Sequence, residues 1–255
     1  MKKHNFFDRT EQGDEKQIRR RTFLSFLGFT AAGATGLFGW KWLNRQPRNG
    51  GALQPLRSTL ETNERILTST FSEHHLVKTY PKSEAAKEVR INTSYGVEKN
   101  IDINNWRMTV RKKDGSEVRF TIDDIKKLPK HDIVFDFKCV EGWSQIQYWS
   151  GVPLADFIAA NGLSDQTDMK YVGLQTPNNQ YFVGLDMHSA LHPQTMLCYE
   201  MNGQPLTSQH GYPLRLIIPV KYGIKNLKSI GLIYFSNAKP HDYWAERGYD
   251  YYAGL

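Results

Sequence analysis

The stretch Phe137-Lys138-Cys139-Val140-Glu141-Gly142-Trp143-Ser144 places one cysteine between an apolar segment and a glycine-containing turn. The alternating residues 133–137 predict a strand, and Gly142-Trp143 predicts the turn that follows it. A thiolate at a strand end can bind a soft metal ion or attack an electrophile. The other cysteine, Cys198, is distant in sequence, which excludes a CxxC redox pair or a Cys-rich zinc site here. A buried structural cysteine is the alternative interpretation.

The N-terminal segment indicates the compartment. Arg19-Arg20-Arg21-Thr22-Phe23-Leu24-Ser25 precedes an apolar stretch over residues 26–40, which Lys41 ends. Paired arginines before x-Phe-Leu and a mildly hydrophobic segment are typical of a twin-arginine export signal, so we expect a periplasmic protein. An ordinary secretory signal or a short membrane anchor is the alternative, because residues 23–43 just reach the length of about 20 apolar residues that a span needs. No clear A-x-A site is present, so retention of the segment as an anchor is also open.

The positive charge of the chain belongs mainly to this first segment. The first fifty residues hold ten of the 33 Lys and Arg and four of the 26 Asp and Glu. The remaining 23 basic and 22 acidic residues nearly balance. The net charge of +7 therefore does not argue for nucleic-acid binding.

Punctuation and pattern divide the chain into three parts. Residues 1–43 are the signal or anchor, residues 44–87 a linker and wrapping arm without its own core, and residues 88–255 a single globular domain. Strands outnumber helices in the domain and do not alternate regularly with them, which predicts an α+β fold with a mixed, β-rich core. The expected strands are 106–110, 118–122, 170–174, 180–184, 196–201, 214–219 and 229–236, and the expected helices are 122–128 and 153–161.

A second informative stretch covers residues 210–228. Its apolar strand, residues 214–218, carries Arg215, and His210 and three lysines flank that strand. A charge inside an apolar strand is costly unless it meets an anion. Arginine and lysine around a glycine turn suit a phosphate or pyrophosphate. An internal carboxylate that pairs with Arg215 is the alternative.

Four blocks, in this order, resemble the sulfite-oxidase-type molybdopterin-dependent oxidoreductases. They are Cys-x-Glu-Gly-Trp-Ser at Cys139, Tyr199-Glu200-Met201-Asn202-Gly203-Gln204-Pro205-Leu206, residues 210–228, and Asp242-Tyr243-Trp244-Ala245-Glu246-Arg247-Gly248-Tyr249. The resemblance covers residues 89–255 and is closest to single-domain bacterial protein-methionine-sulfoxide reductases. It implies a sulfite-oxidase-type molybdopterin-binding domain and a molybdenum–molybdopterin cofactor.

The resemblance also implies roles for individual residues. Cys139 matches the thiolate that binds molybdenum and is thereby the catalytic residue. The positions that match pterin contacts are Asn92, Tyr95, Gly96, Thr176, His210, Arg215, Asn226, Leu227 and Lys228. The chain departs from the vertebrate-type oxidases, which have an arginine soon after the cysteine. It departs from the methionine-sulfoxide reductases at Gly142, where they have alanine, and at His210, where they have asparagine.

The function that follows is oxygen-atom transfer at a Cys-ligated molybdenum by an exported enzyme. The leading hypothesis is sulfoxide reduction, with electrons from a separate partner such as a membrane haem protein. The alternatives are a sulfite dehydrogenase that donates electrons to a cytochrome, and a non-catalytic exported binding module. A pocket without a basic residue near the metal would favour a neutral sulfoxide, unless Lys221, Lys225 or Arg90 reaches it.

A zinc hydrolase is a weaker hypothesis. His188 and His192 are four residues apart, as zinc ligands on a helix often are. No HExxH pattern is present, however, and Pro193 disfavours helix at His192.

Overall fold

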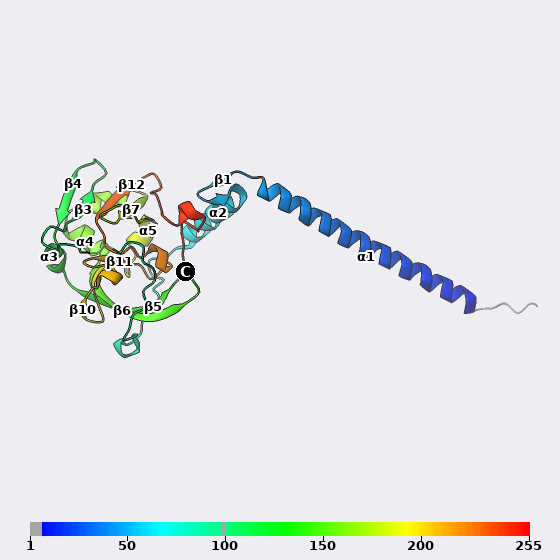
Figure 1. Ribbon diagram of the computed structural model, residues 1–255, viewed down its shortest axis with the longest axis horizontal. Helices are drawn as coiled ribbons and strands as arrows, with labels where there is room; N and C mark the ends of the chain where they lie inside the picture. Colours follow the sequence, from blue (N-terminus) through cyan, green and yellow to red (C-terminus); the bar gives the residue numbers. More distant parts are fainter. Residues whose placement is uncertain (1–6, 98–99) are drawn as a thin grey trace, which may run out of the picture. The chain divides into compact units, whose positions relative to one another are not determined.

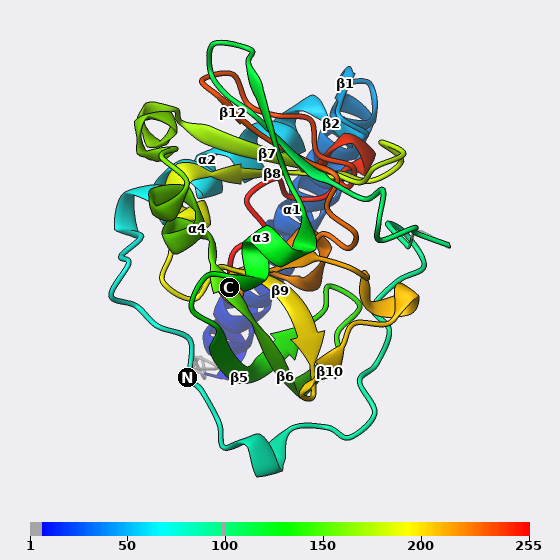
Figure 2. The same cartoon turned by 90° about the vertical axis from the view of Figure 1, so that its left-hand side faces the viewer.

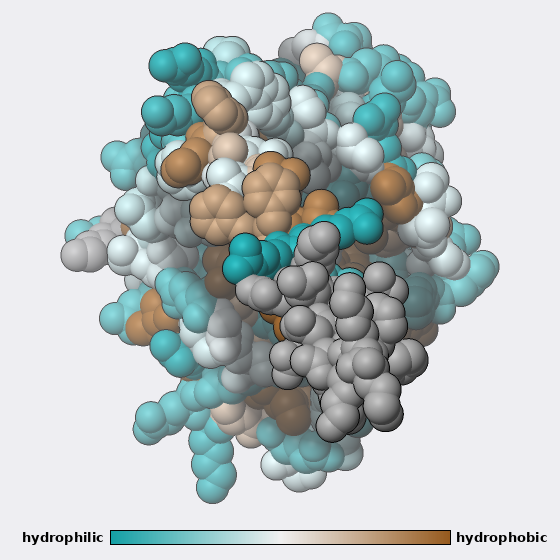
Figure 3. Space-filling model, turned by 90° about the vertical axis from the view of Figure 1, so that its right-hand side faces the viewer, coloured by the Kyte–Doolittle hydropathy of each residue, from teal (hydrophilic) through white to brown (hydrophobic). Residues whose placement is uncertain are grey.

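The computed structural model describes residues 7–97 and 100–255, with the side chains of the first helix described from residue 17 onward. Two compact units form, residues 1–48 with 53–55, and residues 49–52 with 56–255. The first is mainly helix α1, Phe7–Asn44 (Figure 1). Its part Gln17–Asn44 is long and apolar enough to cross a membrane, and no residue of its apolar window is buried. This N-terminal apolar helix fits a signal or a membrane anchor. Figure 3 colours exposed apolar residues brown.

The second unit contains two five-stranded sheets. The first sheet is antiparallel, with the order β10-β9-β6-β5, and β11 also pairs with β9. The second has the order β4-β3-β12-β7-β8 and is mixed, because β12 runs parallel to β3. The strands of the first sheet are β5 His131–Lys138, β6 Ser144–Pro153, β9 Met196–Met201, β10 Gln204–Pro205 and β11 Arg215–Ile217. Those of the second are β3 Met108–Arg111, β4 Glu117–Phe120, β7 Tyr171–Gln175, β8 Phe182–Asp186 and β12 Leu232–Ser236.

Helices and short turns complete the described elements. Helix α3 begins with a capping box in which the Thr121 hydroxyl accepts from the Asp124 backbone N–H, as the sequence Thr-x-x-Asp favours. The other α-helices are α2 Gln54–Thr70, α4 Leu154–Ala160 and α5 Met187–Ala190, and α3 covers Ile122–Lys126. Two-residue strands lie at β1 Arg48–Asn49 and β2 Ala52–Leu53, and 3-10 turns at Lys82–Glu84, Ser164–Asp168, Ser208–His210, Gly223–Lys225 and Ala245–Arg247.

The antiparallel sheet is buried on both faces. Along β9, Leu197 and Tyr199 belong to the larger apolar core, which also takes residues from the mixed sheet and from α3 and α4. Met196 and Cys198 alternate to the other face and join a smaller core with residues of β5 and β6. This double burial explains why β9 reads as a continuous apolar run.

An extended arm, residues 71–97, covers the smaller core. Figure 2 shows it in cyan and teal, passing around the outside of β5 and β6. The Tyr80 backbone N–H donates to the Val134 carbonyl at 2.9 Å, and the Ala86 N–H donates to Ile146 at 2.9 Å. The Gln194 side chain bonds both backbone groups of Val77, at 2.8 and 2.9 Å. The arm therefore satisfies the outer backbone groups of this sheet and seals its apolar face.

The α+β prediction is confirmed, and most expected elements match within a few residues; β9 matches at both ends. Two of the longer elements, strand β6 and helix α2, were not expected, and neither were the short elements β1, β2, β10 and α5. Strand β6 has polar Gln145 and Gln147 on the face that also carries Trp149, which weakens its apolar pattern. Helix α2 lies within the segment read as linker and arm, where buried Arg57 donates to four backbone carbonyls, those of Asn49, Gly50, Ala245 and Tyr249.

Candidate functional site

Cys139 lies at the tip of the β5–β6 hairpin. The turn is closed by the Cys139 backbone N–H, which donates to the Trp143 carbonyl at 2.9 Å, and by the Gly142 N–H, which donates to the Cys139 carbonyl at 3.1 Å. Gly142 has φ +84°, a conformation that favours glycine. The Cys139 thiol is free, and the residue is 5% exposed. Burial raises the pKa of this thiol, while the nearby positive charge of Arg90 lowers it.

The segment 221–228 packs directly beside this hairpin. A Cβ on Gly223 would lie 2.8 Å from the Phe137 ring and 3.4 Å from the Lys138 carbonyl, so only glycine allows this approach. The second informative stretch of the sequence therefore meets the cysteine hairpin in space.

Arg215 is a buried cation without a carboxylate partner. Its side chain donates to the His210 carbonyl at 3.0 Å and the Asn226 carbonyl at 3.3 Å, and the guanidinium lies 4.5 Å from the Trp149 ring centroid. The residue is 1% exposed, and its Nε–H has no partner in the structure. Burial lowers the pKa of Arg215 to about 10. The internal carboxylate considered for Arg215 is not found among the residues whose side chains are described.

Lys228 is the second such cation. Its Nζ donates to the Thr93 carbonyl at 2.5 Å, and the residue is 2% exposed. Burial, with a smaller contribution from Arg215, lowers the pKa of Lys228 to about 7. No carboxylate pairs with it in the described part of the chain. Two neighbouring buried cations without an anion provide a place for an anionic group of a ligand.

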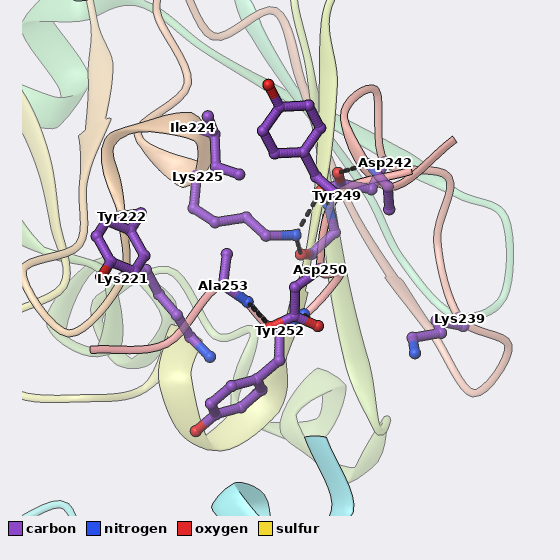
Figure 4. Close-up of polar contacts among 12 residues, drawn as sticks. Lys221, Tyr222, Ile224, Lys225, Lys239, Asp242, Tyr249, Asp250, Tyr252 and Ala253 are labelled. Carbon is purple, nitrogen blue, oxygen red and sulfur yellow. Dashed lines mark hydrogen bonds and ion pairs between the residues drawn. The ribbon is translucent and has the colours of Figure 1, made fainter. Parts of the chain in front are cut away.

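The other two buried lysines of this segment are paired instead. Lys221 Nζ lies 3.3 Å from Asp186. Lys225 Nζ lies 2.5 Å from Asp242, and Figure 4 labels both of these residues. Burial lowers the pKa of Lys221 to about 7, against the opposing effect of Asp186. Each of these lysines has its charge partner within the fold.

His210 connects the site to the arm. Its Nε2 lies 3.1 Å from the Val89 carbonyl and its Nδ1 lies 2.8 Å from the Thr207 hydroxyl. Because a carbonyl only accepts, Nε2 carries the proton, and Nδ1 of the neutral ring accepts from Thr207. Burial lowers the pKa of His210, which favours this neutral form.

The arm residues predicted to contact the pterin, Asn92, Tyr95 and Gly96, lie near the hairpin and the segment 221–228. Asn92 Nδ2 lies 3.5 Å from the Gly223 carbonyl. Gly96 has φ +70°, and a Cβ there would lie 3.6 Å from the Lys228 side chain. Tyr95 is 46% exposed and packs against Tyr181. The arm thus brings Asn92 and Gly96 to the segment that carries Lys228, and Tyr95 to Tyr181.

Three further residues predicted to contact the pterin lie in turns or in the core: Thr176, Leu227 and Asn226. The Thr176 hydroxyl is bonded within the β7–β8 turn, to Asn178 Oδ1 at 2.9 Å and to the Tyr181 backbone. Leu227 has its side chain in the larger core, so only its backbone faces the neighbouring segments. Asn226 Oδ1 accepts from the Ile218 N–H at 2.8 Å, which holds the turn against the strand that carries Arg215.

Trp149 and Gln145 also belong to this site, although neither was expected from the sequence. Trp149 faces the Arg215 guanidinium, and Gln145 bonds the arm on both sides of Val89. Both residues lie on β6, which pairs with β5 over residues 144–151. The period of two in Gln145, Gln147 and Trp149 is the signal that could have found them.

These residues fit a molybdopterin cofactor chemically. A free thiol suits a soft metal, and the two unpaired buried cations, with the orphaned Arg215 Nε–H, suit a phosphate. In the described part of the chain, no group of three or more His, Cys, Asp or Glu could hold a metal ion by itself.

Comparison with known proteins gives the same class. The family model described as oxidoreductase molybdopterin binding domain matches residues 94–244, more than half of the chain. The chain belongs to this family and is a molybdopterin-dependent oxidoreductase with a molybdenum–molybdopterin cofactor.

Two relatives are similar over most of the chain. A candidate protein-methionine-sulfoxide reductase subunit of Azospira oryzae is 36% identical over 72% of this chain and 70% of its own length. A protein-methionine-sulfoxide reductase catalytic subunit of Xanthomonas axonopodis is 31% identical over 92% of this chain and 76% of its own. Among solved structures, the sulfane dehydrogenase SoxCD of Paracoccus pantotrophus matches 66% of this chain and 46% of its own, with a TM-score of 0.49 and 19% identity.

Proposed function

We propose that this protein is an exported enzyme that reduces sulfoxides, methionine sulfoxide among them, by oxygen-atom transfer. The reaction consumes a sulfoxide, two electrons and two protons, and it yields a sulfide and water. The observation that carries the proposal is a free thiol, Cys139, on a hairpin that packs against the segment 221–228. That segment carries Lys228, which with Arg215 forms a pair of buried cations that no carboxylate compensates among the described side chains. The names of the two relatives support the sulfoxide as substrate.

Cys139 would hold the molybdenum, and Arg215 and Lys228 would hold the phosphate of the pterin. The residues that would complete the binding site are Asn92, Tyr95, Gly96, Thr176, His210, Asn226 and the backbone of Leu227. When bound, the cofactor supplies two-electron redox chemistry and exchange of an oxygen atom with the substrate.

The chain itself supplies orientation and exclusion of water. Trp143 is fixed because its Nε1–H donates to Glu141 at 2.9 Å and its ring stacks on Phe137, 6.0 Å between centroids. This rigid aromatic wall borders the cysteine. His210 keeps its proton on Nε2 through the Val89 carbonyl and so holds the arm over the site.

The electrons would come from a separate redox partner, and a membrane haem protein fits the export route. Paired Arg20 and Arg21 before Phe23 support twin-arginine export to the periplasm, where helix α1 would serve as signal or anchor. Replacing both arginines by lysine should leave the protein in the cytoplasm while a reporter with an ordinary secretory signal is still exported. Periplasmic accumulation of the double variant would contradict this route.

The first test is metal and pterin analysis of protein from a host that makes the cofactor. Wild type should contain molybdenum and pterin, and Cys139→Ala should lose molybdenum and activity. Cys198→Ala is the matched control, because Cys198 is also a free, buried thiol but packs in the smaller core. A folded wild type without molybdenum and pterin would refute the proposal. If Cys139→Ala and Cys198→Ala both lost molybdenum and activity, the loss would show only a folding defect.

Substrate assays then separate the two enzyme hypotheses. Reduction of methionine sulfoxide with a viologen donor is the expected result. Oxidation of sulfite without sulfoxide reduction would replace the proposal by a sulfite dehydrogenase.

A further inference from the structure

One exposed cation, Arg90, lies against an aromatic ring of the cysteine hairpin. The guanidinium carbon of Arg90 lies 4.6 Å from the centroid of the Trp143 ring. Arg90 is exposed, and no carboxylate pairs with it among the side chains that the structure describes. The nearest acidic residue of the turn, Glu141, accepts from the Trp143 indole instead. The N–H donors of Arg90 therefore remain available to a ligand.

The backbone of Arg90 is held firmly although its side chain is exposed. The Gln145 side chain accepts from the Arg90 N–H at 2.9 Å and donates to the Glu88 carbonyl at 3.1 Å. Between these contacts, the Val89 carbonyl accepts from His210. The arm is thus bonded at three consecutive residues, so the base of the Arg90 side chain has a defined place.

The Trp143 ring, against which the Arg90 guanidinium lies, is also held in a fixed position. The Trp143 ring lies close to both the Arg90 guanidinium and the Phe137 ring, and the Trp143 carbonyl accepts from the Cys139 N–H at 2.9 Å. A cation–π contact at an exposed site is weak. An anion that approaches Cys139 can therefore recruit the guanidinium at small cost.

The other cations near the hairpin cannot play this part. Lys221 and Lys225 are buried with Asp186 and Asp242. Lys138 is exposed and adjacent to Cys139, but it lines a different hollow, with residues 67–80 and the C-terminal Leu255. It provides a matched control, an exposed charge at the same hairpin that faces elsewhere.

We propose that Arg90 is a specificity residue that binds a carboxylate of the substrate while the sulfoxide of the same molecule lies at Cys139. This inference rests on the proposed function. The preferred substrates are then sulfoxides that carry a carboxylate close to the sulfur. Two sources share this chemistry, the free amino acid derivative and an acidic residue beside a methionine sulfoxide in a polypeptide. Arginine suits the role because it binds a carboxylate through two parallel hydrogen bonds and also stacks on an aromatic ring.

The test compares an anionic with a neutral substrate in the loaded, full-length enzyme. N-acetylmethionine sulfoxide carries the carboxylate, and its N-methylamide does not. Arg90→Gln should raise KM for the anion roughly tenfold, with little change in kcat, and should leave the amide unaffected. Arg90→Lys should recover only part of the preference, and Lys138→Gln should keep it. Higher salt should weaken the preference of the wild type.

A pair of peptides distinguishes the two sources. One peptide has glutamate beside methionine sulfoxide, the other glutamine, and both ends are blocked. Dependence on Arg90 for the glutamate peptide indicates a polypeptide substrate, whereas dependence only for N-acetylmethionine sulfoxide indicates a small molecule. An anionic-to-neutral ratio that Arg90→Gln leaves unchanged for both would overturn the inference.

Calorimetry gives a readout that does not need turnover. The wild type should bind N-acetylmethionine, the anionic product, roughly tenfold more tightly than Arg90→Gln does. Equal binding by both proteins contradicts the role of Arg90. If binding depends on Arg90 but no sulfoxide is reduced, the proposed reaction fails while the carboxylate site stands.

Discussion

The segment 215–228 contains two pairs of buried cations that differ in how their charge is compensated. Lys221 and Lys225 each meet a carboxylate of the same chain, at 3.3 and 2.5 Å. Among the described residues, Arg215 and Lys228 meet carbonyl groups and, for Arg215, the Trp149 ring, but no carboxylate. The charges of the first pair are thus compensated within the fold, whereas we expect an anionic ligand to compensate the second pair.

This difference links the stability of the protein to its cofactor. Burying a charge without a partner costs several kcal/mol even after relaxation, and hydrogen bonds to carbonyls offset only part of that cost. A ligand that binds only the folded state stabilises it in proportion to its affinity and concentration. We therefore expect the cofactor-free protein to carry a penalty at Arg215 and Lys228 that the cofactor removes.

The largest effect is expected at the compensated pair. Asp242→Asn preserves the shape of the side chain but leaves Lys225 buried without its charge partner. Breaking a buried ion pair by removing one partner should lower the free energy of unfolding by about 3–5 kcal/mol. Urea denaturation should show this loss with and without cofactor. A loss that appears only in the loaded protein would place Asp242 in the ligand site instead.

Arg215→Met should destabilise the cofactor-free protein far less than Asp242→Asn does, but it should impair cofactor binding. In the cofactor-free protein the change removes an uncompensated charge, so the free energy of unfolding should change by about 1 kcal/mol or less, or increase. The same variant should retain little molybdenum and pterin, because the phosphate loses its guanidinium. Urea denaturation and metal analysis measure the two effects. A cofactor-free variant as unstable as Asp242→Asn would show that Arg215 has a structural role.

The smallest effect is a pH dependence at Lys228. Burial lowers the pKa of Lys228 from 10.5 to about 7 in the folded protein. Between these values the unfolded chain binds more protons than the folded one, so the stability of the cofactor-free protein should rise with pH across this range. Below the folded pKa, the full cost of the buried charge is present.

Lys228→Met should flatten this rise, as measured by urea denaturation at several pH values. Lys221 contributes a similar rise, since burial also lowers its pKa to about 7, so part of the slope should remain. The loaded protein should show a smaller slope, because an anion beside Lys228 favours its charged form. An unchanged slope in Lys228→Met would mean that its ammonium is not desolvated.

Local patterns predicted much of the domain. Alternation before Cys139 predicted the strand that presents it, and the apolar run 196–201 predicted β9 at both ends. Thr121 caps α3, as the local sequence Thr-x-x-Asp favours. These features depend on neighbours within a few residues, so the sequence expresses them directly.

Strand β6 and helix α2 were missed for an equally physical reason. The polar side chain of Gln145 hydrogen-bonds the backbones of Glu88 and Arg90 in the arm. This polar residue interrupts the apolar pattern of β6. Arg57 is buried because backbone carbonyls of residues 49–50 and 245–249 surround it. A polar residue that serves a distant partner looks, in the sequence, like a surface residue.

The sequence by itself determined the family and the cofactor, because four motifs occur in the order typical of that family. It also determined the place of Cys139 at the end of a strand, because the alternating pattern before it depends on neighbouring residues alone. Only the tertiary structure decided which cations are compensated. Asp186 and Asp242 lie 35 and 17 residues from the lysines they pair with, and no local rule connects them. It likewise placed Arg90 of the arm over Trp143. Charge compensation depends on distance in space and on burial, and both arise only when remote segments pack together.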